Sequence, residues 1–159
     1  MTGMIKAIPV RAYGCHFRST LEYRWATFFT AAGFDWEYEP EGAALDAGNY
    51  LCDFRITGPN GVRVWVEVKP KLEQDQPDDP RWAELAAKSG MMLFTVRGMH
   101  RVHDRCESAH NARVWMPDGT VADVHRLWQG KRYEAAWDAA SEARPDRPGK
   151  GPRRRRGKR

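Results

Sequence analysis

The sequence predicts an α/β fold: a helix, a three-stranded antiparallel meander, a second helix and a fourth strand, followed by a C-terminal hairpin and helix. Three observations predict this order. Apolar residues recur at helical spacing after Ser19, and apolar and polar residues alternate in segments between residues 34 and 69. Further on, an unbroken apolar run at residues 91–96 is bounded by two glycines, as expected of a strand that is buried on both faces.

The first helix is predicted to begin after Ser19 and to follow a short strand over residues 4–10. Ser19 and Glu22 have the spacing of a capping box, in which each side chain bonds to the other residue's backbone N–H. Gly33 is expected to end the helix, because glycine readily adopts the left-handed conformation found there. The helix carries an apolar stripe at helical spacing, formed by Leu21, Trp25, Phe28, Phe29 and Ala32.

Three strands are predicted to follow the helix. In residues 34–38, aromatic and acidic side chains alternate, which favours a strand. Residues 43–49 are predicted to be a loop. Residues 50–56 and 62–69 form two further strands, and the turn-forming residues 58–61 between them predict an antiparallel hairpin.

The next elements are a loop over residues 73–79, a second helix and the apolar strand. Asp79 and Pro80 have the residue types preferred at an N-cap and a first helical position. Trp82 and Leu85 mark the inward side of this helix, and Gly90 its end.

The C-terminal part of the chain is predicted to form a hairpin and a helix. Residues 114–116 and 120–122 are apolar segments on either side of Pro117-Asp118-Gly119, which is a plausible turn. Tyr133 and Trp137 lie on one stripe of a final helix over residues 131–143.

The length of 159 residues, with 42% hydrophobic residues and seven tryptophans, fits one domain with a substantial core. The net charge of +5 is uneven. Residues 144–159 carry nine Lys or Arg and one acid, so residues 1–143 have 17 basic and 20 acidic side chains. The sequence therefore predicts a mildly acidic domain over 1–143 and a disordered basic tail over 144–159 that would bind phosphates without sequence preference. The residues of the tail predicted to contact nucleic acid are Arg153, Arg154, Arg155, Arg156, Lys158 and Arg159.

No apolar stretch approaches the length of a membrane span, and the first residues do not have the layout of a signal peptide. Three widely spaced cysteines give no disulfide framework. We therefore expect a soluble cytoplasmic protein that does not enter a membrane.

Chemistry is predicted at the end of residues 62–69. In a strand, Glu67 and Lys69 share a face because side chains alternate. The predicted hairpin can bring Asp53 near Glu67. Two carboxylates and the Val68 backbone carbonyl are oxygen ligands of the kind that Mg²⁺ uses, and Lys69 could assist a water that attacks a phosphodiester.

These residues resemble the E…PD…ExK signature of the PD-(D/E)XK nuclease superfamily. The resemblance rests on Glu22 in the first helix, residues 50–54 and residues 65–70. Over residues 19–70 the chain is most similar to small phage-type endonucleases and to the TnsA-like endonuclease N-terminal domain. Cys52 stands where the family usually has proline. Proline there shapes the entry to the strand and ligates nothing.

The resemblance implies a restriction-endonuclease-like core and a metal-dependent endodeoxyribonuclease. Asp53 and Glu67 would bind Mg²⁺ or Mn²⁺ together with the Val68 carbonyl, Lys69 would assist the water, and Glu22 would support the metal. DNA is the expected partner, a homodimer is left open, and the expected setting is the cytoplasm of a bacterial or phage-infected cell.

Other interpretations of these residues stay open. The capping box alone would explain Glu22, and a position on an edge strand would let Lys69 reach solvent. The two strand carboxylates would then be solvated residues that pair with Arg55 and Arg63. At the level of function, the chain would then be a catalytically silent DNA-binding or assembly subunit that keeps the nuclease fold. A third hypothesis is a factor that binds RNA, because the basic tail would bind RNA phosphates as well as those of DNA.

Two further features are left undecided. His100, His103, Cys106 and His110 could supply nitrogen and sulfur ligands to zinc, although their spacing matches no common structural zinc site. Trp65 shares the face of Glu67, where it would either line the substrate cleft or lie under the first helix.

Overall fold

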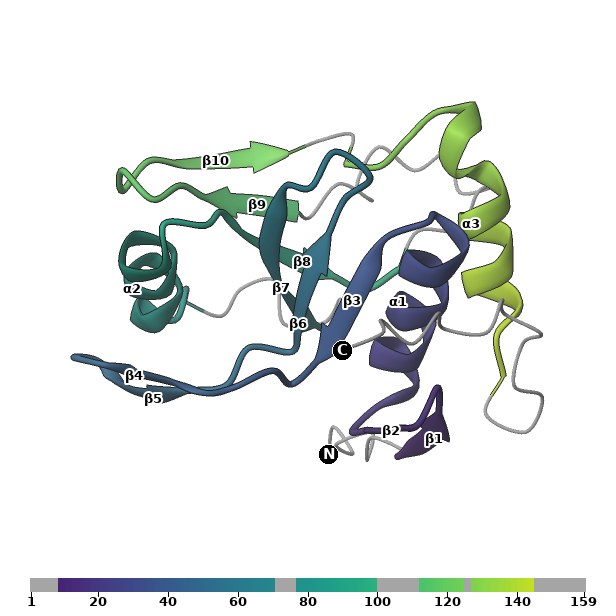
Figure 1. The fold of residues 1–159 in the computed structure, drawn as a ribbon, viewed down its shortest axis with the longest axis horizontal. Coiled ribbons are helices and arrows are strands. Elements are labelled where there is room, and N and C mark those ends of the chain that lie inside the picture. The colour runs from purple at the N-terminus through teal and green to yellow at the C-terminus, as the bar shows by residue number, and fades with distance from the viewer. Residues whose placement is uncertain (1–8, 71–76, 100–111, 125–126, 145–159) are drawn as a thin grey trace, which may run out of the picture.

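A six-stranded mixed sheet in the order β10-β9-β8-β7-β6-β3 forms the centre of the computed structural model, which describes residues 9–70, 77–99, 112–124 and 127–144 (Figure 1). Its strands are β3 (Asp35–Tyr38), β6 (Phe54–Thr57), β7 (Arg63–Lys69), β8 (Leu93–Arg97), β9 (Ala112–Trp115) and β10 (Val121–Val124). The helices of the described residues are α1 (Thr20–Ala31), α2 (Pro80–Ser89) and α3 (Lys131–Glu142).

The sheet is mostly antiparallel, with one parallel pair at its centre. β3, β6 and β7 form the predicted meander, in which Trp36 pairs with Ile56 and Phe54 with Val66. β8 then lies parallel to β7, while β9 and β10 continue antiparallel. Because parallel neighbours cannot be joined by a tight turn, α2 lies in the crossover between β7 and β8.

The helices cover both faces of the sheet and define two apolar layers. Val64, Val66 and Val68 of β7 belong to a core with α1 and α3, which lie side by side in Figure 1. Trp65, between these valines, belongs instead to a second core with Trp82 of α2. β7 is thus buried on both faces, and alternate side chains enter different layers.

The signals that begin and end the first two helices have the predicted roles. Ser19 caps α1 and accepts a hydrogen bond from the Glu22 backbone N–H (3.1 Å). Asp79 caps α2 and accepts from the Arg81 backbone N–H (2.9 Å). Gly90 ends α2 in the left-handed conformation, with φ of 68°, as a C-terminal glycine does. The C-terminal hairpin β9–β10 and α3 also confirm the predicted elements.

The predicted loop over residues 43–49 is wrong, because this segment forms a second hairpin. β4 (Ala43–Leu45) pairs with β5 (Gly48–Tyr50), and the predicted strand 50–56 begins as β6 only at Phe54. Tertiary contact accounts for the difference: the Glu84 carboxylate of α2 accepts hydrogen bonds from the backbone N–H groups of the turn residues Asp46 and Ala47. Local turn chemistry alone did not reveal this partner.

A short hairpin also precedes α1, where the sequence showed no clear period. β1 (Val10–Ala12) pairs with β2 (Cys15–Phe17), and its Val10 and Phe17 belong to the core under α1. Most of the strand predicted over residues 4–10, and residues 73–76 of the predicted loop, lie outside the described residues.

Replacing Ser19 with alanine should lower the free energy of unfolding by about 1 kcal/mol, because the Glu22 backbone N–H would lose its capping acceptor. Urea denaturation monitored by circular dichroism measures this change. Ser141→Ala is the control, since Ser141 lies inside α3 and alanine is a better helix former. An equal loss in both variants would contradict the capping role.

Candidate functional site

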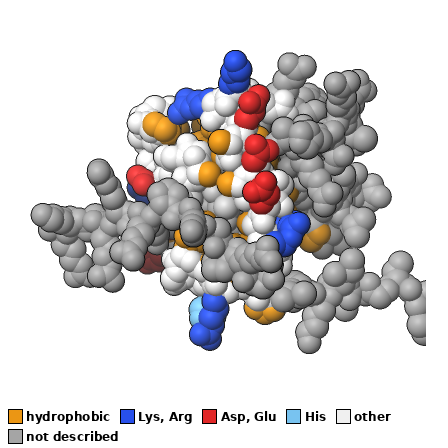
Figure 2. Space-filling view, turned by 90° about the vertical axis from the view of Figure 1, so that its right-hand side faces the viewer, with side chains coloured by type: hydrophobic (Ala, Val, Ile, Leu, Met, Phe, Trp, Pro, Cys, Tyr) orange, Lys and Arg blue, Asp and Glu red, His pale blue; other side chains and the backbone are white. Residues whose placement is uncertain are grey.

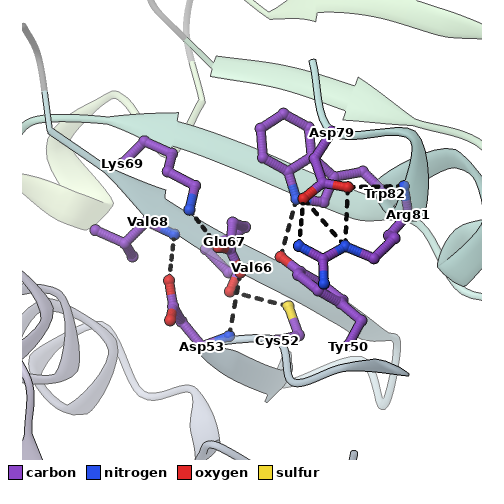
Figure 3. Close-up of polar contacts among 10 residues, drawn as sticks. All are labelled: Tyr50, Cys52, Asp53, Val66, Glu67, Val68, Lys69, Asp79, Arg81 and Trp82. Carbon is purple, nitrogen blue, oxygen red and sulfur yellow. Dashed lines mark hydrogen bonds and ion pairs between the residues drawn. The ribbon is translucent and has the colours of Figure 1, made fainter. Parts of the chain in front are cut away.

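Strand β7 continues past the point where its neighbour β6 begins. Phe54, the first residue of β6, pairs with Val66, so the last three residues of β7 lie beside the chain that enters β6. There the Val68 backbone N–H donates to the Asp53 carboxylate (2.8 Å), and the Asp53 backbone N–H donates to the Glu67 carboxylate (3.3 Å; Figure 3). These two hydrogen bonds hold Asp53 beside residues 67 and 68, so that the two predicted carboxylates lie at the same end of β7.

Lys69 joins the two acids on the α2 side of the sheet. Its Nζ lies 2.8 Å from Oε1 of Glu67 and 5.9 Å from the ring centre of Trp82. The Glu67 side chain is 5% exposed and that of Lys69 is 33% exposed. The ammonium group therefore stands between a buried carboxylate and solvent, where it can offset the charge of an incoming anion.

Two of the alternative interpretations of these side chains are wrong. β7 lies between β6 and β8, so Lys69 is not on an edge strand. Glu67 is buried and pairs with Lys69, whereas the Arg55 guanidinium is bound to Glu37 (2.6 Å). Glu67 is thus no solvated strand residue balanced by a neighbouring arginine.

The environment of Asp53 favours its neutral form. Burial, and next the negative charge of Glu67, raise the pKa of Asp53 from 3.8 to about 8, against the opposing effects of the Val68 N–H and Lys69. The proton on Asp53 removes a negative charge from a poorly solvated place beside the Glu67 carboxylate. A divalent cation that bound there would displace the proton and supply the missing charge.

Glu22 lies at the border of this cluster and is held by other groups. Its Oε2 accepts hydrogen bonds from the Tyr38 hydroxyl (2.7 Å) and the Arg18 backbone N–H (2.9 Å). The expected return bond of the capping box, to the Ser19 N–H, is thus replaced by one to the preceding residue. Glu22 is near enough for its charge to contribute to the raised pKa of Asp53, after Glu67.

Cys52 fills the position of the expected proline with a buried thiol. Its Sγ donates to the carbonyl oxygen of Val66 (3.4 Å), and the side chain belongs to the apolar layer under α2. Burial, followed by the charges of Glu67 and Asp53, raises the pKa of the thiol well above its ordinary value. A neutral thiol fits this place, and the strand still delivers Asp53 to Val68.

The structure adds residues that the sequence reasoning did not assign to the site. Tyr50 accepts a hydrogen bond from Nε1 of Trp82 (2.9 Å), and the guanidinium of Arg81 lies 4.8 Å from the centre of the Tyr50 ring (Figure 3). Arg81 also pairs with Asp79 (2.7 Å) and donates to the Asn49 carbonyl (2.9 Å). The only signal in the sequence was a basic residue in the first turn of a helix, which is too common to single out.

Trp65 is a core residue of the layer under α2. It is buried under α2, rather than under the first helix as one alternative proposed, and its Nε1 donates to the Ser89 hydroxyl (3.0 Å). Arg55 lies over its ring at 5.5 Å. Alternation placed Trp65 on the correct face, but only the crossover shows which helix covers that face.

The oxygen atoms of the cluster are of the chemical type that a hard divalent cation binds. In a strand, the N–H and C=O of one residue point to the same side, so the Val68 carbonyl lies on the side of Asp53, to which its N–H donates. Asp53, Glu67 and this carbonyl are oxygen donors of the type that Mg²⁺ and Mn²⁺ prefer. Within the described ranges, no group of three acidic, histidine or cysteine side chains converges on one point, so Glu22 does not complete a three-carboxylate set.

Some predicted residues cannot be placed. His100, His103, Cys106 and His110 lie outside the described residues, and so do the tail residues Arg153–Arg156, Lys158 and Arg159.

The chain matches no protein-family model, no curated protein and no solved structure. Among the helices of the described residues, none has the length and apolar character needed to cross a membrane.

In the metal-free protein, the free energy of unfolding should fall as the pH rises, and replacing Asp53 with asparagine should make this fall smaller. The pKa of Asp53 is higher in the folded state than its ordinary 3.8, so the folded protein binds this proton more tightly. The tighter binding of this proton stabilises the folded state fully at low pH, and this stabilisation is lost as the pH rises towards about 8. Urea denaturation in the presence of a chelator measures the free energy of unfolding at pH 5 and pH 8. Its decrease between these two pH values should be larger in the wild type than in Asp53→Asn by on the order of 2 kcal/mol.

Asp35→Asn serves as the control, because Asp35 is exposed on β3 and should follow the wild-type pH dependence. Equal pH dependence in the wild type and Asp53→Asn would show that the buried carboxylate pair does not hold an extra proton.

Proposed function

We propose that this protein is a metal-dependent endodeoxyribonuclease with a restriction-endonuclease-like core, related to the PD-(D/E)XK nucleases. The observation that carries the proposal is the convergence of Asp53, Glu67 and Lys69 at the end of β7. Buried carboxylates beside a lysine are costly to fold, so their presence favours a functional explanation over a structural one.

The order of elements supports this proposal. α1, the antiparallel strands β3, β6 and β7, then α2 and β8 follow the order that the resemblance implies, with the β4–β5 hairpin inserted before Asp53. The three site residues come from two neighbouring strand ends, and α2 crosses the sheet on the same face as Glu67. This order of elements supports the proposal beside the resemblance in motif.

Each side chain has a role that follows from its surroundings. Asp53, Glu67 and the Val68 carbonyl would hold Mg²⁺ or Mn²⁺, which when bound polarises the phosphate and activates water. Lys69, at the boundary with solvent, would orient the attacking water and balance charge on the phosphate. Glu22 keeps the negative potential of the site high from its position on Tyr38.

Most of the affinity for DNA would come from the basic tail, outside the acidic domain. The tail residues Arg153–Arg156 would supply positive charge that binds the phosphate backbone of DNA. Arg81 adds a guanidinium beside the carboxylate cluster. Arg81 is bound to Asp79, so its net attraction for a phosphate is moderated by that carboxylate.

One observation favours a second candidate function, a DNA-binding or assembly subunit without turnover. The Glu22 carboxylate accepts hydrogen bonds from Tyr38 and Arg18. Two carboxylates rather than three are then left to bind the proposed metal ion. A member of the nuclease superfamily that had lost catalysis would keep the strands and the basic tail, while its former metal ligands would bind other protein groups.

Plasmid cleavage with Mg²⁺ distinguishes the two functions. We expect the wild type to nick or linearise DNA, and Asp53→Asn, Glu67→Gln and Lys69→Met to reduce the rate at least 100-fold, the usual size of losing an essential acid, base or charge. Asp35→Asn and Glu134→Gln are matched controls, since both residues are exposed and lie on other elements.

A wild type that binds DNA but cuts no form of it with Mg²⁺ or Mn²⁺ supports the assembly subunit. Stronger binding to RNA in a competition experiment would instead support the RNA-directed alternative.

The tail should supply salt-sensitive affinity. Replacing Arg153, Arg154, Arg155 and Arg156 with serine should reduce the slope of log affinity against log salt by about 3 to 4, because each neutralised phosphate contributes about 0.9. Fluorescence anisotropy with a labelled duplex at several salt concentrations measures the slope. An unchanged slope would exclude the tail from the interface.

A further inference from the structure

An open cavity of about 530 Å³ lies near the end of β7 opposite to the carboxylate cluster. It is on the other face of the sheet, because Ile56 and Val64 contribute to the α1 and α3 layer whereas Glu67 faces α2. The turn residues from Gly58 to Val62 form part of its wall. The apolar side chains that line it are Phe34, Ile56, Val64, Phe94, Trp128 and Tyr133.

Aromatic rings dominate the cavity. The rings of Phe34 and Tyr133 are parallel to within 2°, with centres 6.4 Å apart, and both residues are only half-buried. Trp128 meets Phe34 edge to face at 5.7 Å. Because these residues are half-buried, part of each ring remains accessible to solvent. Exposed parts of aromatic rings suit a flat aromatic ligand, which can stack on them with little preference for its identity.

Trp128 is held in this wall in a strained conformation. Its φ of 52° lies in the left-handed region, which a bulky residue rarely adopts. The Trp137 side chain stabilises the conformation by donating from Nε1 to the Trp128 carbonyl oxygen (2.8 Å). Strain of this kind concentrates at ligand sites, where the surrounding structure enforces it.

Positive charge lies at the rim of the cavity. α3 begins there, and its N-cap is Gly130, which has no side chain to cap the first backbone N–H groups. Lys131 and Arg132 are exposed in this first turn, and the Arg132 guanidinium lies 5.4 Å from the centre of the Tyr133 ring. The cavity therefore combines aromatic walls with an entrance that favours an anion.

The charge along α3 limits where the anion can lie. Exposed acidic residues follow at intervals of four, at Glu134, Asp138 and Glu142, and Figure 2 shows acidic side chains in a column on this side of the molecule with basic ones above. Glu134 lies in the first turn of α3 and offsets part of the positive charge of Lys131 and Arg132 there. A phosphate is therefore attracted to the start of the helix, beside Lys131 and Arg132, and is repelled further along it by Asp138 and Glu142.

We propose that this cavity binds one unpaired nucleotide of a nucleic-acid strand, with the base against the aromatic walls and a phosphate at the start of α3. Aromatic and arginine planes are the usual surfaces on which unstacked bases lie, and a helix start with two cations suits the attached phosphate. The site goes beyond the proposed hydrolysis and uses neither Asp53 nor Glu67.

The experiment measures binding of a labelled 12-nucleotide single strand by anisotropy and of deoxyadenosine monophosphate by calorimetry. The protein carries serine at Arg153–Arg156, so that the tail does not dominate the signal. Arg132→Glu and Tyr133→Leu should each weaken strand binding at least tenfold. Tyr133→Phe keeps the ring and should bind as the parent does, and so should Arg11→Glu, a matched change on the exposed part of β1.

Unchanged strand affinity in Arg132→Glu and Tyr133→Leu would overturn the proposal. So would inorganic phosphate binding as tightly as the mononucleotide, which would leave the aromatic walls without a role, and mononucleotide binding without strand binding, which would point to a free nucleotide. Because Arg132 is exposed, its replacement leaves the fold intact. The proposal is judged by strand and mononucleotide binding alone, so an absence of plasmid cleavage would count only against the proposed nuclease.

Discussion

The burial of β7 on both faces is the constraint from which the site follows. Because alternate side chains of this strand enter different layers, Val66 and Val68 pack towards α1 and α3 while Glu67 and Lys69 face α2. A shift of register by one residue would bury the charges of Glu67 and Lys69 in the valine layer, which is strongly unfavourable. The core and the polar site therefore specify the same register.

The cluster also shows how a small region can carry charge that the fold does not need. Asp53 and Glu67 each accept a hydrogen bond from a backbone N–H, and Glu67 also pairs with Lys69. These contacts reduce the cost of burial without removing it. Replacing such a buried group by apolar residues is often neutral or stabilising in other proteins. The cost of burying two acids here supports the proposal of a divalent cation as their ligand.

The two proposed sites lie on opposite faces of the sheet and have opposite electrostatic character. The carboxylate cluster attracts cations, whereas the cavity beside Trp128 opens at the basic start of α3. A nucleic acid could contact the carboxylate cluster through a metal ion and the cavity through a stacked base. To reach both sites, it would have to pass around the β6–β7 end of the sheet. Such a path would involve a single-stranded segment rather than a straight duplex.

The sequence by itself determined the elements whose signals are local. Ser19, Asp79 and Gly90 mark helix ends through their own hydrogen bonds or backbone conformation, and alternation placed Glu67 and Lys69 on one face. Tertiary structure alone decided that residues 43–50 form a hairpin on α2, that Glu22 binds Tyr38, and that Arg81 lies over Tyr50. The reason is physical: these features depend on contacts between segments far apart in the chain, and neither periodicity nor capping describes such contacts.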